Sequence, residues 1–343
     1  MYRKQIYDIN ADLKKTRKAI IAIGCSFVQG QGAIDDELYD NYKWKELSIG
    51  NQIEIEVSKL ERDDLLKKYP LLCKPHDLEK MIDFTFMEYD NAFVNVLCKK
   101  YFNGKYTPIN LGQRGCGNRA SIKELYFYPD LYWHLIEEII VIYMPSGLER
   151  VDFVNDQWQD HFHWVATWPY YKDMEDSPDK KLREGYGRRL YSEKFEILEQ
   201  ISHVQELITW CSAKNAKLII TPGFDIRYNK KYFKKNLNKT IFRNDFGEID
   251  NFYNSFFTTN PDTDLLNLFP WDLVFKPDNY ETFALLCMGQ ESLTDTTDHF
   301  FQFLNNRSPG GWITSCAHPG KKSHDLFAKK LFEYIEKGNL PCL

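Results

Sequence analysis

The sequence predicts an α/β fold in which parallel strands alternate with helices. Short apolar runs rich in β-branched residues recur along the chain, as they do in the buried strands of parallel sheets. Stretches of helical period lie between these runs, so we expect a crossover helix between successive strands. Glycine-rich or polar turns follow the runs, at the sheet edge where open α/β folds place their sites.

Four apolar runs have the length and composition of buried strands: 19–24, 106–111, 139–143 and 216–221. Apolar side chains recur at helical spacing in four further stretches: 88–102, the segment from the second glycine-rich loop to about Tyr128, 193–213 and 320–337. A lead-in strand or helix is expected before residue 19. The repeated order of strand and helix predicts a single domain over 1–343.

Three long stretches interrupt this order. Residues 33–80 are charged and irregular and read as an insertion, with room for a helix. Residues 150–190 are rich in Trp, Tyr, Asp and His without a clear period, which predicts a loop-rich excursion. Residues 224–310, aromatic and broken by prolines, form the second large insertion. Because such excursions leave from the carboxyl ends of strands, we expect them to form the walls or lid of a site.

The composition excludes several classes of partner. The chain has 343 residues, of which 43% are hydrophobic, so a sizeable core is available. Its net charge is −5 and it has no long basic run, which argues against a nucleic-acid binder. The densest basic cluster, 230–235, is predicted to be a solvated face. No apolar run is long enough to span a bilayer, so we expect no membrane partner.

The cysteines and the N-terminal segment suggest a cellular setting. Eight cysteines occur without a CxxC pair or regular spacing, which favours free thiols in a reducing compartment. Residues 1–18 are charged throughout and do not resemble a signal peptide. A cytoplasmic location is therefore expected.

Ser26 stands where the first strand meets a loop, in the glycine-rich stretch from Gly24 to Gly32. Glycines there let the backbone turn tightly or approach a ligand closely. A serine hydroxyl becomes a nucleophile when a base removes its proton. His318, just before the last predicted helix, is the candidate base. The alternative is a turn serine and a surface histidine.

Donors for a developing oxyanion follow the next two strands. The loop from 110 to 119 offers the backbone N–H of Gly115 and the side chain of Asn118, and Ser146 follows the third strand. Such preorganised donors stabilise the tetrahedral intermediate of acyl transfer. Asn118 has the alternative role of an ordinary helix cap. His324 is expected to cap or pack the closing helix rather than to act in chemistry.

Other chemistries fit the sequence less well. The first glycine-rich loop has neither the pattern of a P-loop nor that of a dinucleotide fingerprint. Cys25, Cys116 and Cys316 lie near the proposed residues, but buried cysteines are commonly inert packing residues. The segments 160–163 and 298–299 contain Asp and His without the spacing of a strong metal site. We therefore expect neither a metal nor a cofactor.

These blocks resemble the SGNH (GDSL-like) hydrolases. The segment Gly24-Cys25-Ser26-Phe27 is similar to the nucleophile block, 110–115 to the block whose glycine N–H serves the oxyanion hole, and His318-Pro319 to the block of the general base. The resemblance is closest to variants common in phages and marine bacteria, which carry a Ser/Thr…Arg pattern after the third strand. Here that pattern is Ser146…Arg150, which makes Arg150 a candidate substrate contact.

Two departures from the family pattern matter. Met144-Pro145-Ser146-Gly147 stands where the family has Gly-x-Asn-Asp, so Ser146 or Asn118 would have to replace the oxyanion asparagine. Ser315 stands where the family keeps the acid that orients the histidine. Either a backbone carbonyl orients His318, or an acid comes from elsewhere. The candidate acids are Asp225, Asp295 and Asp298.

The resemblance implies a flavodoxin-like three-layer α/β/α sandwich with a central parallel sheet and two long insertions. It implies a serine ester hydrolase that removes acyl groups from a carbohydrate or a small ester and needs no cofactor. The alternative is a catalytically degenerate binding or structural protein on the same fold, such as a phage virion component. A homo-oligomer or a virion assembly would be the corresponding setting.

Overall fold

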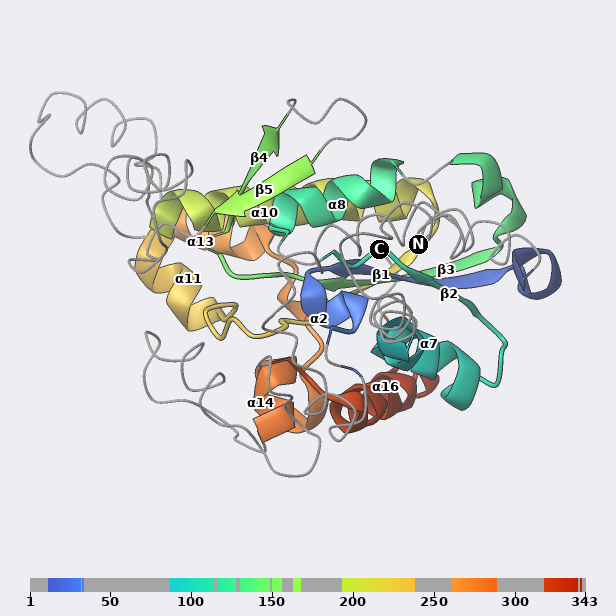
Figure 1. Cartoon of the computed structure of the whole chain (residues 1–343). Coiled ribbons are helices and arrows are strands. Elements are labelled where there is room, and N and C mark those ends of the chain that lie inside the picture. The colour runs from blue at the N-terminus through green and yellow to red at the C-terminus, as the bar shows by residue number, and fades with distance from the viewer. Residues whose placement is uncertain are drawn as a thin grey trace, which may run out of the picture.

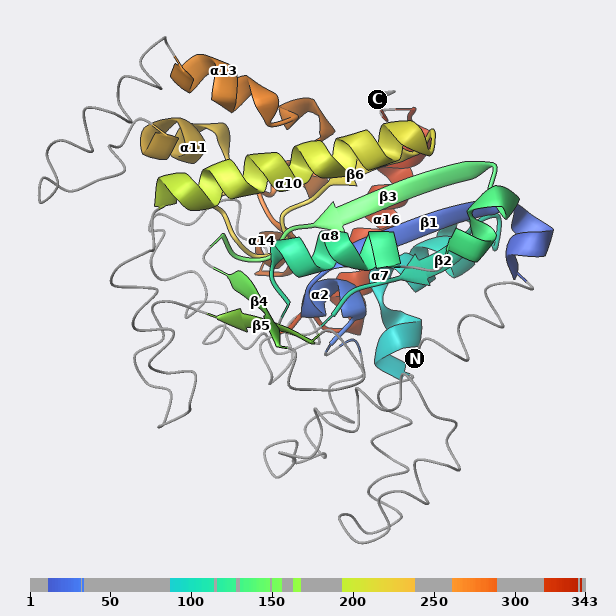
Figure 2. The same ribbon diagram turned by 90° about the horizontal axis from the view of Figure 1, so that it is seen from above.

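In the computed structural model of the chain, the structure describes residues 12–31, 33, 87–113, 116–127, 130–148, 150–155, 163–167, 193–237, 261–288, 318–338 and 340. Four parallel strands form one sheet in the order β2-β1-β3-β6 (Figure 2). They are β1 (Lys18–Gly24), β2 (Thr107–Asn110), β3 (Glu138–Met144) and β6 (Lys217–Ile220). Helices accompany this sheet, so the predicted α/β class is confirmed. Each bound lies within one residue of the predicted strand.

The register of the strands brings their carboxyl ends to one edge of the sheet. β1 and β3 pair along their whole length, from Lys18 opposite Glu138 to Gly24 opposite Met144. β2 pairs with the other side of β1, and β6 pairs with the other side of β3. Because all pairs are parallel, the loops that follow the four strands gather at this carboxyl edge.

Helices cover both faces of the sheet (Figures 1 and 2). The core on one face includes side chains from α8 (Asn118–Phe127), α10 (Glu193–Ala213), α11 (Lys230–Leu237) and α13 (Pro261–Leu268). The core on the other face includes α2 (Ser26–Gln29), α7 (Phe93–Val96), α14 (Phe283–Met288) and α16 (Lys321–Glu336). Side chains alternate along β1 between the two cores, because successive residues of a strand point to opposite faces. Both faces of the central strands are therefore buried.

The predicted helices form with one notable interruption. α10 has the predicted bounds, and α16 lies one residue inside its predicted ones at each end. The predicted helix over 88–102 is divided into a helix at 87–91, α7 and a π-helical segment, Leu97–Tyr101. The division lies at Ala92, whose backbone is extended (φ −56°, ψ 141°). A straight amphipathic helix was the simplest reading of the apolar spacing, but the chain turns at this alanine.

The long excursions contain more regular structure than the sequence suggests. Within 150–190, β4 (Val151–Asn155) and β5 (His163–Thr167) form an antiparallel hairpin. The second insertion, 224–310, supplies α11, α13 and α14, and its Phe233, Phe269 and Phe283 are almost fully buried in the two cores. These parts of the insertion complete the sheet's faces. Apart from Ala33, the insertion at 33–80 lies outside the described residues.

The described residues also show the state of the cysteines and the character of the helices. The five cysteines among them are free and buried: Cys25, Cys98, Cys116, Cys211 and Cys287. No helix within the described ranges has both the length and the apolar character that crossing a membrane requires.

Candidate active site

Ser26 and His318 meet at the carboxyl edge of the sheet. The distance from Ser26 Oγ to His318 Nε2 is 2.9 Å, although the two residues are 292 positions apart in the sequence. Ser26 follows β1 and opens α2, and His318 lies just before α16. At this distance an imidazole nitrogen can accept the hydroxyl proton directly.

Two glycines fix the turn that presents Ser26. Gly24 ends β1 with φ +154°, and a Cβ there would stand 2.5 Å from the carbonyl oxygen of Met144. Gly30 ends α2 in the left-handed region (φ +94°), and a Cβ there would stand 2.6 Å from the carbonyl oxygen of Glu88. Only glycine is accommodated at either position without moving backbone. The strand therefore gives way to the helix within two residues.

The N–H group of Ser26 lies in the first turn of α2, where backbone donors have no partner inside the helix. No acceptor for this N–H group occurs among the residues that the structure describes. Ser26 itself is only 6% exposed. The serine thus combines a hydroxyl bonded to histidine with an amide that can donate to a bound oxygen.

An aromatic side chain borders His318. The ring of Phe27 lies 5.5 Å from the His318 ring, nearly edge-on. Phe27 also contacts Phe224, with the ring centroids 5.5 Å apart. The guanidinium carbon of Arg150 lies 5.4 Å from the centroid of Phe224, and Arg150 Nη1 donates to the carbonyl oxygen of Cys116 at 3.1 Å. Arg150 is therefore held beside the aromatic group that borders the serine–histidine pair.

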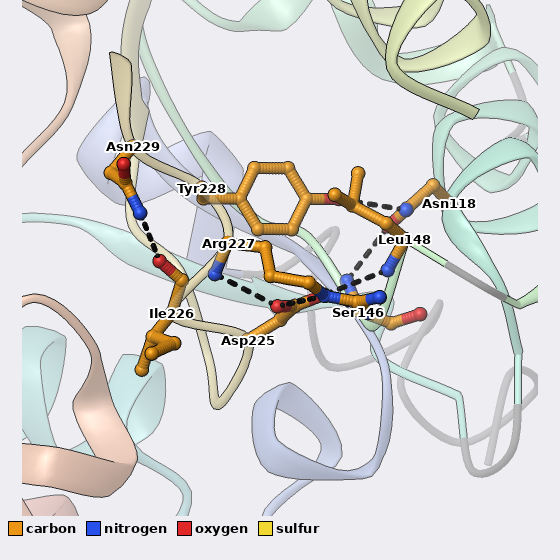
Figure 3. Close-up of polar contacts among 8 residues, drawn as sticks. All are labelled: Asn118, Ser146, Leu148, Asp225, Ile226, Arg227, Tyr228 and Asn229. Carbon is orange, nitrogen blue, oxygen red and sulfur yellow. Dashed lines mark hydrogen bonds and ion pairs between the residues drawn. The ribbon is translucent and has the colours of Figure 1, made fainter. Parts of the chain in front are cut away.

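Asn118 joins three loops at the carboxyl edge (Figure 3). Its Oδ1 accepts a hydrogen bond from the Ser146 N–H at 2.7 Å, and its Nδ2 donates to the Tyr228 hydroxyl at 2.9 Å. Asn118 opens α8 after β2, Ser146 follows β3, and Tyr228 follows β6. The amide of Asn118 thus holds the loops together.

Ser146 carries a hydroxyl that is not used in this network. The residue is fully buried, and its Oγ has no hydrogen-bond partner within the described part of the chain. Thr221 Oγ1, just after β6, is a second buried hydroxyl of this kind among the described residues. A buried polar atom without a partner is costly, and such atoms often mark a place where a ligand or water binds. Asn118 and Ser146 are the two candidates for the role that an oxyanion-binding asparagine has in the SGNH hydrolases. The side-chain nitrogen of Asn118 already donates to Tyr228, whereas the Ser146 hydroxyl has no partner among the described residues.

Asp225 holds the loop after β6 through four hydrogen bonds (Figure 3). Its Oδ1 accepts from the N–H and the Nε of Arg227, at 2.9 and 2.8 Å. Its Oδ2 accepts from the Leu148 N–H at 2.9 Å and from Arg227 Nη2 at 2.6 Å. These donors occupy about four acceptor positions, the number that a carboxylate offers. Asp225 therefore serves Arg227 and Leu148, and none of its bonds reaches His318.

Burial governs the charge of this carboxyl. Complete burial raises the pKa of Asp225 to about 6, and the N–H donors of Leu148 and Arg227 favour the ionised form. The carboxylate is still ionised at neutral pH. It forms a buried ion pair with Arg227, whose side chain is 17% exposed.

Some of the sequence candidates are not described by the structure, and the cysteines near the pair have other surroundings. Gly115, Asp295 and Asp298 lie outside the described residues, as does Cys316. Cys25 is fully buried. The Cys116 thiol lies within hydrogen-bonding distance of Gly24 O, Gln113 O and Ser121 Oγ, at 3.3, 3.2 and 3.1 Å. Ser26, by contrast, is hydrogen-bonded to His318.

Three residues that support the site were not predicted from the sequence. Phe224, Arg227 and Tyr228 lie in a stretch whose pattern indicates only an insertion. A usable signal was present: the fourth strand is followed by Asp225-Ile226-Arg227, and polar residues at such a strand end belong to the edge where sites form.

Comparison with known proteins yields no relative: no family model matches the chain, and neither the curated proteins nor the solved structures contain a significant match. The chemistry of the described residues is therefore the guide to function.

Proposed function

We propose that the protein is a serine hydrolase that cleaves ester bonds, with Ser26 as nucleophile and His318 as general base. The observation that carries the proposal is the 2.9 Å contact between Ser26 Oγ and His318 Nε2. Two side chains without a common role would rarely lie this close together when 292 positions separate them in the sequence. The position of the pair at the carboxyl edge of a parallel sheet also fits a site of chemistry.

The reaction follows from the roles of the two side chains. His318 Nε2 takes the Ser26 proton as Oγ attacks the ester carbonyl carbon. The tetrahedral intermediate then expels the alcohol, which receives that proton from His318. Water, deprotonated by the same nitrogen, attacks the acyl-enzyme, and the departing Ser26 oxygen recovers a proton. The acid is released and the enzyme is restored.

The oxyanion is stabilised by donors that the protein holds in place before the substrate binds. The Ser26 N–H group and the Ser146 hydroxyl are two donors at this edge that have no other partner among the described residues. Gly115 is the further candidate that the family resemblance names. Asn118 does not contact the oxyanion in this proposal. It positions Ser146, because its side-chain oxygen accepts a hydrogen bond from the Ser146 N–H.

The family resemblance supports a finer reading of the fold and of the substrate. A flavodoxin-like three-layer sandwich of the SGNH type accounts for helices on both faces and for a site at the carboxyl edge. An acylated carbohydrate or a small ester fits the aromatic border formed by Phe27 and Phe224. Arg150, held on Phe224, is the proposed contact for a polar group of the substrate.

Labelling with a fluorophosphonate probe tests the proposal. The probe forms a covalent bond with an activated serine oxygen and loses fluoride. We expect the wild type to be labelled on the peptide that contains Ser26, and Ser26→Ala and His318→Ala to remain unlabelled while folded. A screen of acetylated sugars and small esters would then define the substrate. Labelling that persists in Ser26→Ala would contradict the assignment.

A non-catalytic binding or structural protein is the second candidate. Two observations favour it: Ser26 is only 6% exposed, and the described candidate acid, Asp225, is engaged by Arg227 and Leu148. Loss of the orienting acid can lower the rate of such an enzyme by about four powers of ten. A folded wild type that resists both the probe and the ester screen would support this second candidate.

A further inference from the structure

His324 is a fully buried histidine that lies six residues after the proposed base. Its Nδ1 accepts a hydrogen bond from the backbone N–H of Phe93 at 3.1 Å. Phe93 is the first residue of α7, and the preceding residue, Ala92, supplies no side-chain cap. His324 therefore caps α7 from another helix, because it satisfies a donor that α7 itself leaves unpaired.

The junction Ala92–Phe93 contacts the two helices that adjoin the serine–histidine pair, α2 and α16. On one side it packs against the end of α2: a Cβ on Gly30 would stand 2.7 Å from the Cβ of Ala92. On the other side it bonds His324, in the first turn of α16. Ser26 opens α2, and His318 immediately precedes α16. The position of one helix relative to the other thus depends on this junction.

The surroundings of His324 show that packing alone does not explain a histidine here. Its ring lies parallel to the Phe93 ring at 6.2 Å and edge-on to the Phe283 ring at 5.3 Å. Its Nε2 has no hydrogen-bond partner within the described residues. A leucine or phenylalanine would fill the same apolar space without burying an unpaired polar atom. The feature that only the histidine provides is the acceptor for the Phe93 N–H.

The geometry points to His324 as a positioning residue that holds His318 against Ser26 by docking α16 on the start of α7. This inference rests on the proposed function for its catalytic consequence. Because Nδ1 accepts, the neutral ring carries its proton on Nε2. Burial lowers the pKa of His324 to about 3, so the ring keeps this form at neutral pH.

A matched pair of substitutions isolates the acceptor. Asparagine places Oδ1 two bonds from Cβ, where histidine has Nδ1, and leucine has the same branched shape without an acceptor. His324→Leu is expected to lower the rate constant for fluorophosphonate labelling of Ser26 by about tenfold or more, since small displacements of reacting groups cost up to about a hundredfold. His324→Asn is expected to stay within about threefold of the wild type.

The control is Phe327→Leu, on the same helix. Phe327 packs against Phe93 at 5.0 Å and Phe283 at 4.3 Å, but it forms no hydrogen bond to α7. This variant loses stability without losing the acceptor, so its labelling rate should stay near that of the wild type at temperatures where it is folded. Equal losses in His324→Leu and Phe327→Leu at equal stability would overturn the inference, as would equal losses in His324→Leu and His324→Asn.

Two readouts do not depend on activity. Hydrogen exchange of the Phe93 amide should be faster in His324→Leu than in His324→Asn. The ring Cε1–H resonance of His318, assigned by its absence in His318→Ala, should shift in His324→Leu and stay in place in His324→Asn. If the wild type is never labelled, the proposed function fails, and these readouts still decide whether His324 positions His318. Unchanged exchange and an unchanged His318 resonance in His324→Leu would overturn the inference.

Discussion

The backbone N–H of Ser146 donates to the side-chain oxygen of Asn118 at 2.7 Å, which ties the loop after the third strand to the start of α8. The side-chain nitrogen of Asn118 donates a second hydrogen bond, to the Tyr228 hydroxyl. One side chain therefore fixes the relative positions of three loops at the carboxyl edge. Its removal would leave a buried N–H and a buried hydroxyl without partners.

Asn118→Ala is expected to lower the free energy of unfolding by about 2 to 4 kcal/mol, because each buried group left unpaired costs about 1 to 3 kcal/mol. Urea unfolding measures this loss. Asn118→Asp is the control, since it keeps the oxygen for Ser146 and removes the donor for Tyr228. An alanine variant as stable as the wild type would contradict the role of Asn118.

Ser146→Ala should affect stability and reactivity in opposite directions. The Ser146 hydroxyl has no partner among the described residues, so its removal should leave the free energy of unfolding unchanged or raise it slightly. If the hydroxyl donates to the oxyanion, labelling and ester cleavage should fall by about a hundredfold. Thermal melts and probe kinetics on the same samples test both parts. Unchanged kinetics would remove Ser146 from the oxyanion site.

Asp225→Ala should be strongly destabilising. It removes the carboxylate that pairs with the largely buried guanidinium of Arg227, and breaking a buried ion pair in this way costs about 3 to 5 kcal/mol. A double-mutant cycle with Arg227→Met measures the coupling. We expect the double variant to lose less stability than the two single variants together. Strict additivity would show that the two side chains do not stabilise each other.

Gly24→Ala should prevent the turn that presents Ser26. The new methyl group would stand 2.5 Å from a backbone oxygen, at a φ of +154°. Gly104→Ala is the matched control: its φ is +73°, but no atom lies within 4 Å of the added carbon. We expect a cost of about 1 kcal/mol at Gly104 and a larger loss, with no labelling of Ser26, at Gly24. Similar melting temperatures for the two variants would contradict this reading.

Acid should weaken the fold through His324 and His203. Burial lowers the pKa of His324 to about 3 and that of His203 to about 4, so the unfolded chain binds their protons more readily as the pH falls below about 6.5. The stabilisation is fully present above that pH and declines below it. The His324 contribution between pH 7 and pH 5 is about 2 kcal/mol.

Asp225 acts in the opposite direction, because its pKa is raised to about 6 and the folded protein takes up its proton first. The measurement is therefore a difference between two proteins. The free energy of unfolding should fall by about 2 kcal/mol less from pH 7 to pH 5 in His324→Asn than in the wild type. Parallel pH profiles would show that His324 is not held neutral by the fold.

The parts of the fold with a strong local pattern could be predicted from the sequence. The apolar runs of β1 and β3 and the helical spacing of α10 and α16 fix these elements to within one residue. The hairpin of β4 and β5 could not be predicted, because its strands lack a period of two that stands out from the surrounding aromatic residues. The turn at Ala92 depends on packing against Gly30, which is 62 positions away.

The residues of the candidate site also differ in how far they could be predicted from the sequence. Ser26 and His318 follow from residue type and from their places beside a strand and a helix. The supporting contacts do not, because nothing local indicates that Asn118 bonds Ser146 or that His324 bonds Phe93. Asp225 illustrates the limit: its place after the fourth strand made it a candidate partner of His318, and only the three-dimensional contacts show that Arg227 and Leu148 occupy it.

The separation of 292 positions between Ser26 and His318 has a consequence for the nascent chain. The first strand and its serine leave the ribosome early, while the segment that carries the histidine has yet to be made. Until α16 closes the second face of the sheet, the serine has no base and its apolar surroundings are open. Under the proposed function, a partly synthesised or truncated chain would therefore have no hydrolase activity, and it exposes a surface on which chaperones can act.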